Sequence, residues 1–142
     1  MEAGETPVQA ALREIREELG IAESDVLWTE PFDTLVTYTG LAIHTVFGQL
    51  RPEALDRIQA APAEVAEWFT IPVEWLASND PYVYEYRVVP EIREDFPYDM
   101  VESPDKYNWR TGRCTVPIWH YGGYCLWGMT ARMVVSILKF LA

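Results

Sequence analysis

A chain of 142 residues fits one domain, and 49% hydrophobic with 13% aromatic residues is enough to build a core. Its 22 acidic and 11 basic residues leave a net charge of −11, which excludes the basic footprint that nucleic-acid binding needs. The same charge would repel a phosphate-bearing substrate unless metal ions lie between the two.

The first predicted element is a helix over residues 7–19. Thr6 suits the N-cap and Pro7 the first helical position, while Gln9 stands three residues after the cap and completes a capping box. Gly20 marks the C-terminal end. An apolar stripe that can dock on a sheet is formed by Ala11, Leu12, Ile15 and Leu19.

Three carboxylates of this helix, Glu14, Glu17 and Glu18, stand at i, i+3 and i+4 and therefore share one face. Like charges at these spacings weaken an isolated helix by roughly 0.2–0.5 kcal/mol per pair. A hard divalent cation with oxygen ligands, Mg²⁺ or Mn²⁺, would offset this repulsion. Arg13 is predicted to reach Glu5 or Glu17. A solvated acidic face is the alternative that the charge pattern alone leaves open.

The later elements are predicted from β-prone runs, apolar periodicity and turn residues. Strands are expected at 25–30, 34–39, 41–50, 64–70, 82–89 and 115–121, and helices at 73–77 and 127–141. Residues 51–60 are predicted to form a loop or short helix, residues 90–112 a long loop, and Gly40 and Gly122-Gly123 turns. No internal repeat is visible, which predicts a single domain over residues 1–142.

Cys114 and Cys125 lack the spacing of a metal or redox motif, and we expect them to be buried free thiols. The sequence shows no signal peptide and no run of 18 apolar residues. These features predict a cytoplasmic location without a membrane segment.

Residues 5–21 resemble the Nudix box, Gly-x5-Glu-x7-Arg-Glu-U-x-Glu-Glu-x-Gly-U, where U is a bulky aliphatic residue. Every specified position from the first Glu onward is matched, by Glu5, Arg13-Glu14-Ile15, Glu17-Glu18 and Gly20-Ile21. The resemblance implies an α/β (α+β) Nudix fold with a mixed sheet between helices. It also implies an enzyme that hydrolyses the diphosphate linkage of a nucleoside diphosphate derivative.

The same resemblance implies roles for the polar residues of the box. Metal ions would orient the attacking water, lower its pKa and offset charge on the phosphoryl oxygens. Glu14, Glu17 and Glu18 would be metal ligands, and Glu14 or Glu17 would also activate the water. Arg13 would orient these glutamates, and Glu5 would support Arg13.

The leading Gly of the box would stand two residues upstream of Met1, so we expect the N-terminal part of the usual domain to be missing. A sheet that lacks strands leaves unpaired backbone edges, which folded proteins cover or pair. We therefore expect a homodimer or a larger assembly in which a partner covers that edge.

Two later segments resemble the coenzyme A pyrophosphatase branch of the family. One is residues 63–76, and the other combines residues 118–121 with Leu126-Trp127-Gly128-Met129-Thr130-Ala131-Arg132. This resemblance implies coenzyme A or an acyl-coenzyme A as the substrate, with ADP-ribose or a dinucleotide as alternatives. A non-catalytic module that binds a ligand or partner is the hypothesis from a different class.

Further candidates lie outside the box. Glu64, and more weakly Glu67, would supply another metal ligand or a base. His44 is predicted to be a core or edge residue of a strand. Aromatic rings suit stacking on adenine, although packing is their alternative role. The candidates for substrate binding are Tyr82, Tyr84, Trp109 and His120, with Tyr86 and Tyr107 as further aromatic possibilities.

Overall fold

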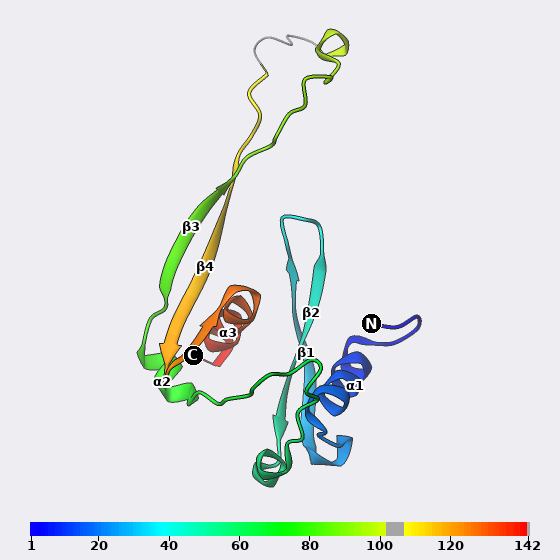
Figure 1. Cartoon of the computed structure of the whole chain (residues 1–142), viewed down its shortest axis with the longest axis vertical. Coiled ribbons are helices and arrows are strands. Elements are labelled where there is room, and N and C mark those ends of the chain that lie inside the picture. Colours follow the sequence, from blue (N-terminus) through cyan, green and yellow to red (C-terminus); the bar gives the residue numbers. More distant parts are fainter. Residues whose placement is uncertain (102–106, 142) are drawn as a thin grey trace. The chain divides into compact units, whose positions relative to one another are not determined.

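The structure is a computed structural model that describes residues 1–101 and 107–141 (Figure 1). Its α-helices are α1 (Pro7–Leu19), α2 (Val73–Ser78) and α3 (Gly128–Leu141). Its strands are β1 (Val26–Val36), β2 (Ala42–Leu50), β3 (Tyr82–Val88), β4 (Gly112–Tyr121) and β5 (Tyr124–Trp127). Short 3₁₀ helices are η1 (Glu23–Asp25), η2 (Pro52–Arg57) and η3 (Tyr98–Met100).

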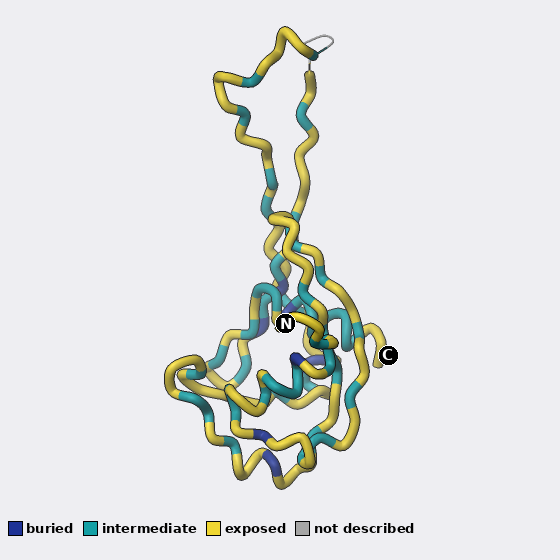
Figure 2. Tube along the Cα trace, turned by 90° about the vertical axis from the view of Figure 1, so that its right-hand side faces the viewer, coloured by how far each residue is buried: buried dark blue, intermediate teal, exposed yellow. Residues whose placement is uncertain are grey.

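Most of the described chain is exposed or half-buried, as Figure 2 shows along the trace. The buried hydrophobic residues of the described chain are Ala10, Ile21, Ala54, Leu76, Trp119 and Ala131. Half of them are alanines, so the buried core is small. Among the described residues, no helix is both long and apolar enough to cross a bilayer.

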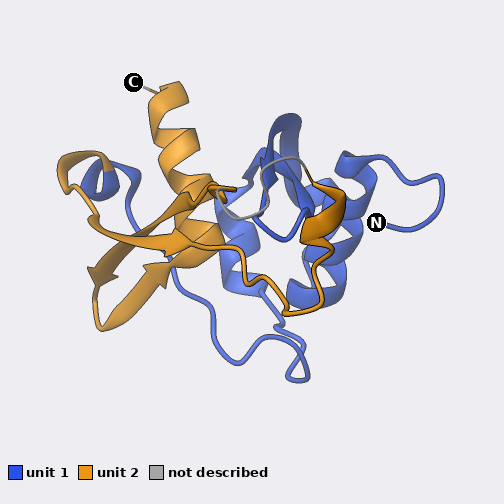
Figure 3. Ribbon diagram, turned by 90° about the horizontal axis from the view of Figure 1, so that it is seen from above, with its two compact units in different colours: residues 1–76 blue, residues 77–142 orange. Residues whose placement is uncertain are grey.

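The chain divides into two compact units, residues 1–76 and 77–142, which are coloured separately in Figure 3. The described strands pair antiparallel in two sheets, one of order β1-β2 and one of order β3-β4-β5. The predicted α+β class is confirmed, but these strands form two antiparallel sheets and not the one mixed sheet that was expected. The physical reason is that each strand pairs with its neighbour in sequence, whereas parallel pairing needs a long crossover.

In the first unit, α1 packs beside the β1–β2 ribbon (Figure 1). The two strands predicted at 25–30 and 34–39 are one strand, β1, whose register shifts between Pro31 and Thr34. Pro31 has no N–H to donate to the ladder, which suits an irregular position. Two hydrogen bonds stabilise this irregular segment. Asp33 N–H donates to Thr45 Oγ1 (3.0 Å), and the Thr45 hydroxyl donates to the Asp33 carbonyl (2.9 Å).

The strand predicted at 64–70 is wrong, because the structure has a turn and irregular chain there. The N–H groups of Glu64 and Val65 both donate to the Ala61 carbonyl, at 3.0 and 2.9 Å. Donors that bond back along the chain are not available to a neighbouring strand. The predicted helix at 73–77 is confirmed as α2.

In the second unit, α3 packs against β4 and β5. The indole N–H of Trp119 in β4 donates to the Asn79 carbonyl at 2.7 Å, so this buried ring has a polar partner. Strand β5 was missed by the sequence prediction, which began the last helix at Trp127. It is four residues long and follows a Gly122-Gly123 turn in which both glycines have positive φ, as tight hairpins of this kind require.

Both cysteines are free, as predicted. They are not buried, however, because Cys114 is half-buried and Cys125 is exposed.

Gly20 ends α1 in the left-handed region, at φ 68, and donates its N–H to the Arg16 carbonyl at 3.0 Å. A Cβ placed on Gly20 would lie 3.2 Å from Gln59 Cβ and 3.3 Å from the Gln59 carbonyl oxygen. Gly40 also has positive φ, but a Cβ there would meet nothing within 4 Å. A side chain at either glycine would strain the backbone, but only at Gly20 would it also crowd a neighbouring residue. Comparing the two positions therefore distinguishes the effect of crowding from that of strain.

We predict that Gly20→Ala lowers the free energy of unfolding more than Gly40→Ala does. Both substitutions carry the cost of a left-handed alanine, about 1–3 kcal/mol, and only Gly20→Ala also crowds Gln59. Urea unfolding of the two variants measures the difference. Equal losses of stability would show that the contact with Gln59 is easily relaxed.

Candidate active site

The helix α1 begins and ends as its sequence predicts. The hydroxyl of Thr6 accepts the N–H of Gln9 at 3.3 Å, and the Gln9 side chain accepts the N–H of Thr6 at 2.9 Å. This reciprocal pair satisfies two backbone donors that have no partner inside the helix. The capping fixes where the helix starts, and the i, i+3 and i+4 spacing of Glu14, Glu17 and Glu18 places them on one face.

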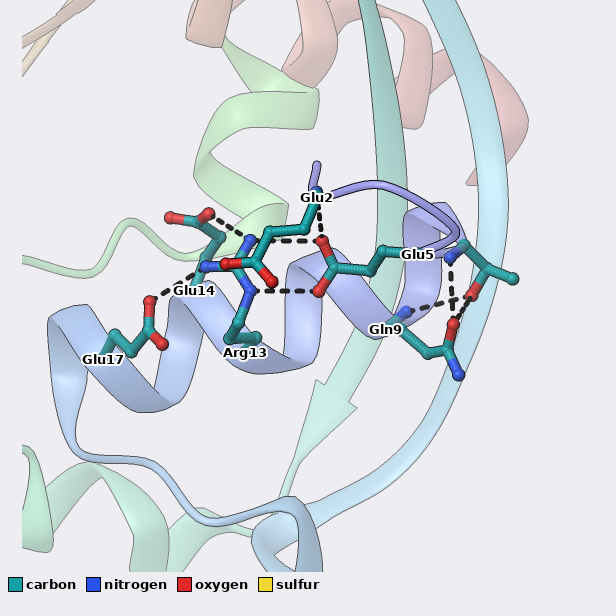
Figure 4. A network of polar contacts seen from close by, with 7 residues as sticks. Glu2, Glu5, Gln9, Arg13, Glu14 and Glu17 are labelled. Carbon is teal, nitrogen blue, oxygen red and sulfur yellow. Dashed lines mark hydrogen bonds and ion pairs between the residues drawn. The ribbon is translucent and has the colours of Figure 1, made fainter.

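The centre of that face is the guanidinium of Arg13 (Figure 4). Arg13 binds Glu5 with two nitrogens, Nε to Oε1 at 2.9 Å and Nη2 to Oε2 at 3.2 Å. Its Nη2 also lies 2.8 Å from Glu14 Oε1, and its Nη1 lies 2.9 Å from Glu17 Oε2. Arg13 was predicted to reach Glu5 or Glu17, and the structure shows that it contacts both, together with Glu14.

The two ends of this cluster differ in exposure. The side chains of Glu5 and Arg13 are 13% and 21% exposed, whereas those of Glu14 and Glu17 are 49% and 52% exposed. The hydrogen bond from Arg13, followed by the backbone N–H of Glu2, lowers the pKa of Glu5 below its ordinary value of 4.5. The carboxylates, with Glu5 first, raise the pKa of Arg13, so its charge is permanent. Glu5 and Arg13 therefore form the sheltered part of the cluster, and Glu14 and Glu17 face solvent.

The donor set of α1 fits a hard cation in its chemistry, because Glu14, Glu17 and Glu18 offer carboxylate oxygens from adjacent turns. Within residues 1–101 and 107–141, no group of three or more acidic, His or Cys side chains is gathered closely enough to hold an ion. Two of the three glutamates are instead paired with Arg13. A cation would have to replace Arg13 as the partner of Glu14 and Glu17.

The segment that carries Glu64 is tied to the C-terminal end of α1. Gln59 N–H donates to the Leu19 carbonyl at 2.9 Å, and Ala61 N–H donates to the Glu18 carbonyl at 2.7 Å. Glu64 follows in the turn that starts at Ala61 and is exposed. The structure thus places the backbone of this segment beside the last turn of α1, although Glu64 lies in a turn and not on the expected strand.

Two hollows adjoin the N-terminal half of α1, and sequence reasoning missed both. One, of about 380 Å³, is lined by Glu14 of α1 and by His44 of β2. The other, of about 330 Å³, is lined by His44 together with Asp33 and Thr34 of β1. His44 is an exposed strand residue whose Nδ1 lies 2.9 Å from Thr34 Oγ1. No sequence signal marked it, because the pairing of Thr34 with His44 depends on the register of β1 and β2.

Three of the four candidates for substrate binding share one face of the β3-β4-β5 sheet. Tyr82 pairs with Ile118, and His120 stands two residues further along β4, so Tyr82, Tyr84 and His120 point to the same side. All three are exposed. This arrangement suits a flat aromatic ligand as well as it suits a protein partner.

The fourth candidate, Trp109, lies in the connection between β3 and β4 and contacts other rings. Its ring packs edge-on against Phe96 and Tyr107, with centroids 5.3 and 4.7 Å apart. The Nε1 atom of Trp109 is buried without a hydrogen-bond partner among the described residues. Trp109 therefore belongs to a small aromatic cluster, with packing as its observed role.

We predict that Glu5→Gln is less stable than the wild-type chain at pH 7 and that the gap closes in acid. Because folding lowers the pKa of Glu5, its contribution is complete above about pH 4.5 and is lost as the pH falls through the folded-state value. Urea unfolding between pH 7 and pH 3 measures the gap. Glu30→Gln, on an exposed site without an ion pair in the described chain, is the control. If both variants lose the same free energy of unfolding with the same pH dependence, the role of the Glu5–Arg13 pair is contradicted.

The chain was compared with known families and with curated proteins. A family model described as the NUDIX domain matches residues 1–91, which contain the whole acidic face of α1, the β1–β2 ribbon and the Glu64 segment. No curated protein matches the chain.

Proposed function

The chain belongs to the NUDIX family, and from this premise we propose that it hydrolyses a diphosphate linkage with Glu14, Glu17 and Glu18 as the ligands of Mg²⁺ or Mn²⁺. The family is one of pyrophosphohydrolases that act on nucleoside diphosphate derivatives and generally use such ions. The observation that carries the proposal is the box pattern of residues 5–21, present on a capped helix with Arg13 bound to Glu5.

The bound cation would supply a polarised water and would offset negative charge on the phosphoryl oxygens. Glu14 and Glu17 are half-exposed and are held on one side only, by single Arg13 nitrogens. Glu5 binds the same guanidinium with both oxygens and is better sheltered. We infer that Arg13 stays on Glu5 when Glu14 and Glu17 turn to the cation. The charge of Arg13 beside them then limits their mutual repulsion.

Proton transfer is the second task, and we assign it to Glu14 or Glu17. A general base has to lie within hydrogen-bond reach of the water that it deprotonates. Both carboxylates stand on the exposed side of the Arg13 cluster, where a water and a phosphate can approach. Glu64 is proposed as a further metal ligand, supported by the hydrogen bond that ties its segment to Glu18 of α1.

For the substrate, we propose coenzyme A or an acyl-coenzyme A, with ADP-ribose or a dinucleotide as the alternative. The support is the pattern of residues 63–76 and 126–132, together with the exposed aromatic side chains of Tyr82 and Tyr84. These rings, with His120 on the same face, are proposed to contact the adenine.

A non-catalytic NUDIX module is the second candidate function. It is favoured by the observation that Arg13 already neutralises two of the three candidate ligands. A homodimer in the cytoplasm also remains a prediction. The homodimer is supported by the β1–β2 ribbon, in which each described strand has one partner and one unpaired edge.

We predict that the double variant Glu17→Gln/Glu18→Gln weakens Mn²⁺ binding at least about tenfold, because ligand charge sets the affinity of such sites. Both substitutions keep the side-chain volume on an exposed or half-buried helix face, so the far-UV circular dichroism should not change. Isothermal titration calorimetry with Mn²⁺ is the measurement.

The control for this prediction is Glu30→Gln/Glu53→Gln, which removes two carboxylates from exposed positions of β1 and η2. Loss of Mn²⁺ binding in both double variants would indicate a general effect of charge. Unchanged binding in the α1 variant would refute the assignment of the metal ligands.

We predict that the chain cleaves coenzyme A with a kcat/KM at least about tenfold higher than that for ADP-ribose, which corresponds to about 1.4 kcal/mol of barrier. A steady-state assay of both substrates with Mg²⁺ and with Mn²⁺ tests this preference. Equal or reversed values would refute the coenzyme A assignment and leave hydrolysis of another diphosphate standing. No turnover of either, or of dinucleotides, would favour the non-catalytic module.

A further inference from the structure

His44 stands where the two hollows beside α1 meet. Both hollows are lined by His44 and by Pro7, and they differ in their acidic residue, Glu14 in one and Asp33 in the other. Their volumes, about 380 and 330 Å³, lie within the range of about 300–1,000 Å³ that is usual for ligand pockets. The residues of the box account for Glu14 but not for His44.

The imidazole of His44 is oriented by its neighbour on β1. Thr34 pairs with His44 across the ribbon, and its Oγ1 lies 2.9 Å from Nδ1. When the Thr34 hydroxyl donates to Nδ1, the neutral ring carries its proton on Nε2. In the imidazolium both nitrogens carry protons, and the hydroxyl accepts from Nδ1. Nε2 has no hydrogen-bond partner within the described part of the chain. The ring therefore has one nitrogen anchored by Thr34, and the other, Nε2, is available to a ligand.

The charges of the surrounding side chains indicate what kind of ligand His44 could bind. Of the side chains that line the hollow with Glu14, only that of His44 can become positive. The two arginines of α1, Arg13 and Arg16, line a different hollow, and Arg13 is already bound by three carboxylates. The charged side chains that line the two hollows with His44 are Glu14 from α1 and Asp33 from β1, and both are acidic. Met1, which carries the α-ammonium group, also lines the hollow with Glu14. Among the described side chains that line this hollow, that of His44 is the one that can donate an N–H group to an anionic ligand.

We propose that His44 binds a phosphoryl oxygen of the substrate's diphosphate through Nε2–H, in the hollow that it shares with Glu14. This inference rests on the proposed function and adds a substrate-binding residue from β2 to the carboxylates of α1. Thr34 is its positioning residue, because its hydroxyl anchors Nδ1 and leaves Nε2 for the ligand. A diphosphate held by His44 would lie next to Glu14, where the cation is proposed to bind.

The test is calorimetric binding of ADP in the presence of Mg²⁺, which does not depend on turnover. His44→Ala should raise the Kd for ADP at least about tenfold, in line with the loss of a hydrogen bond to a charged group. His44→Gln should recover most of the affinity, since its amide N–H₂ can donate. His44→Phe keeps a β-prone ring without a donor and should bind as weakly as His44→Ala, so the test stands if the alanine variant does not fold.

Gln49→Ala is the matched control. Gln49 lies on the same strand and accepts a cross-strand hydrogen bond from Trp28 Nε1 at 2.8 Å, but it lines neither hollow. It should therefore bind ADP as the wild-type chain does. A weakening equal to that of His44→Ala would show that loss of a ribbon hydrogen bond suffices, and would overturn the proposal.

Two other results would overturn it, namely no ADP binding by the wild-type chain and an unchanged Kd in His44→Ala. The proposed function fails separately. Binding of ADP that depends on His44, without hydrolysis of any diphosphate substrate, would refute the enzyme and leave the His44 site standing. If the chain hydrolyses a diphosphate substrate but the His44 variants bind ADP as the wild-type chain does, the His44 site alone is refuted.

Discussion

The bidentate pair of Arg13 and Glu5 is the interaction on which the acidic face of α1 depends. Glu5 precedes the helix and Arg13 lies in its second turn, so their two hydrogen bonds tie the entering chain to the helix. The pair also fixes a positive charge beside Glu14 and Glu17, which would otherwise repel each other at i and i+3. Glu5 and Arg13 are the sheltered members of the cluster, whereas Glu14 and Glu17 are about half exposed.

The rest of the first unit is arranged around this helix. At its C-terminal end, the carbonyls of Glu18 and Leu19 accept the N–H groups of Ala61 and Gln59, so the free end of the helix is satisfied by a distant segment. Beside the helix, the β1–β2 ribbon contributes His44 to the hollow that Glu14 also lines. One helix therefore organises a charged cluster, a turn that carries another carboxylate, and a hollow with an imidazole.

The apolar side of α1 is not closely packed against the β1–β2 ribbon. Its predicted stripe packs toward the ribbon, yet a hollow of about 240 Å³ remains there, lined by Ala11, Leu12 and Ile15 with residues of β1 and β2. Unfilled apolar space of this kind lacks the contacts that close packing supplies. The apolar side of the helix therefore leaves space that further apolar groups could fill.

The sequence by itself determined the features that depend on near neighbours in the chain. The cap by Thr6 and Gln9, the stop at Gly20 and the reach of Arg13 to Glu17 involve residues that are three or four positions apart or a local backbone preference. These interactions form in any helix of this sequence, so the acidic face and its candidate ligands were predictable. The box pattern of residues 5–21 likewise indicates the family from the sequence alone.

The tertiary structure decided what depends on register and on distant partners. Residues 64–70 are β-prone, but the N–H groups of Glu64 and Val65 donate to the Ala61 carbonyl, and Ala61 itself donates to the Glu18 carbonyl at the end of α1. The segment therefore begins as a turn and not as a strand. The pairing of Thr34 with His44 depends on the β1–β2 register after an irregular step, and the shared face of Tyr82 and His120 depends on the β3–β4 register. Side chains change face with every residue of register, and register is set across the sheet, so sequence periodicity alone could not place these residues.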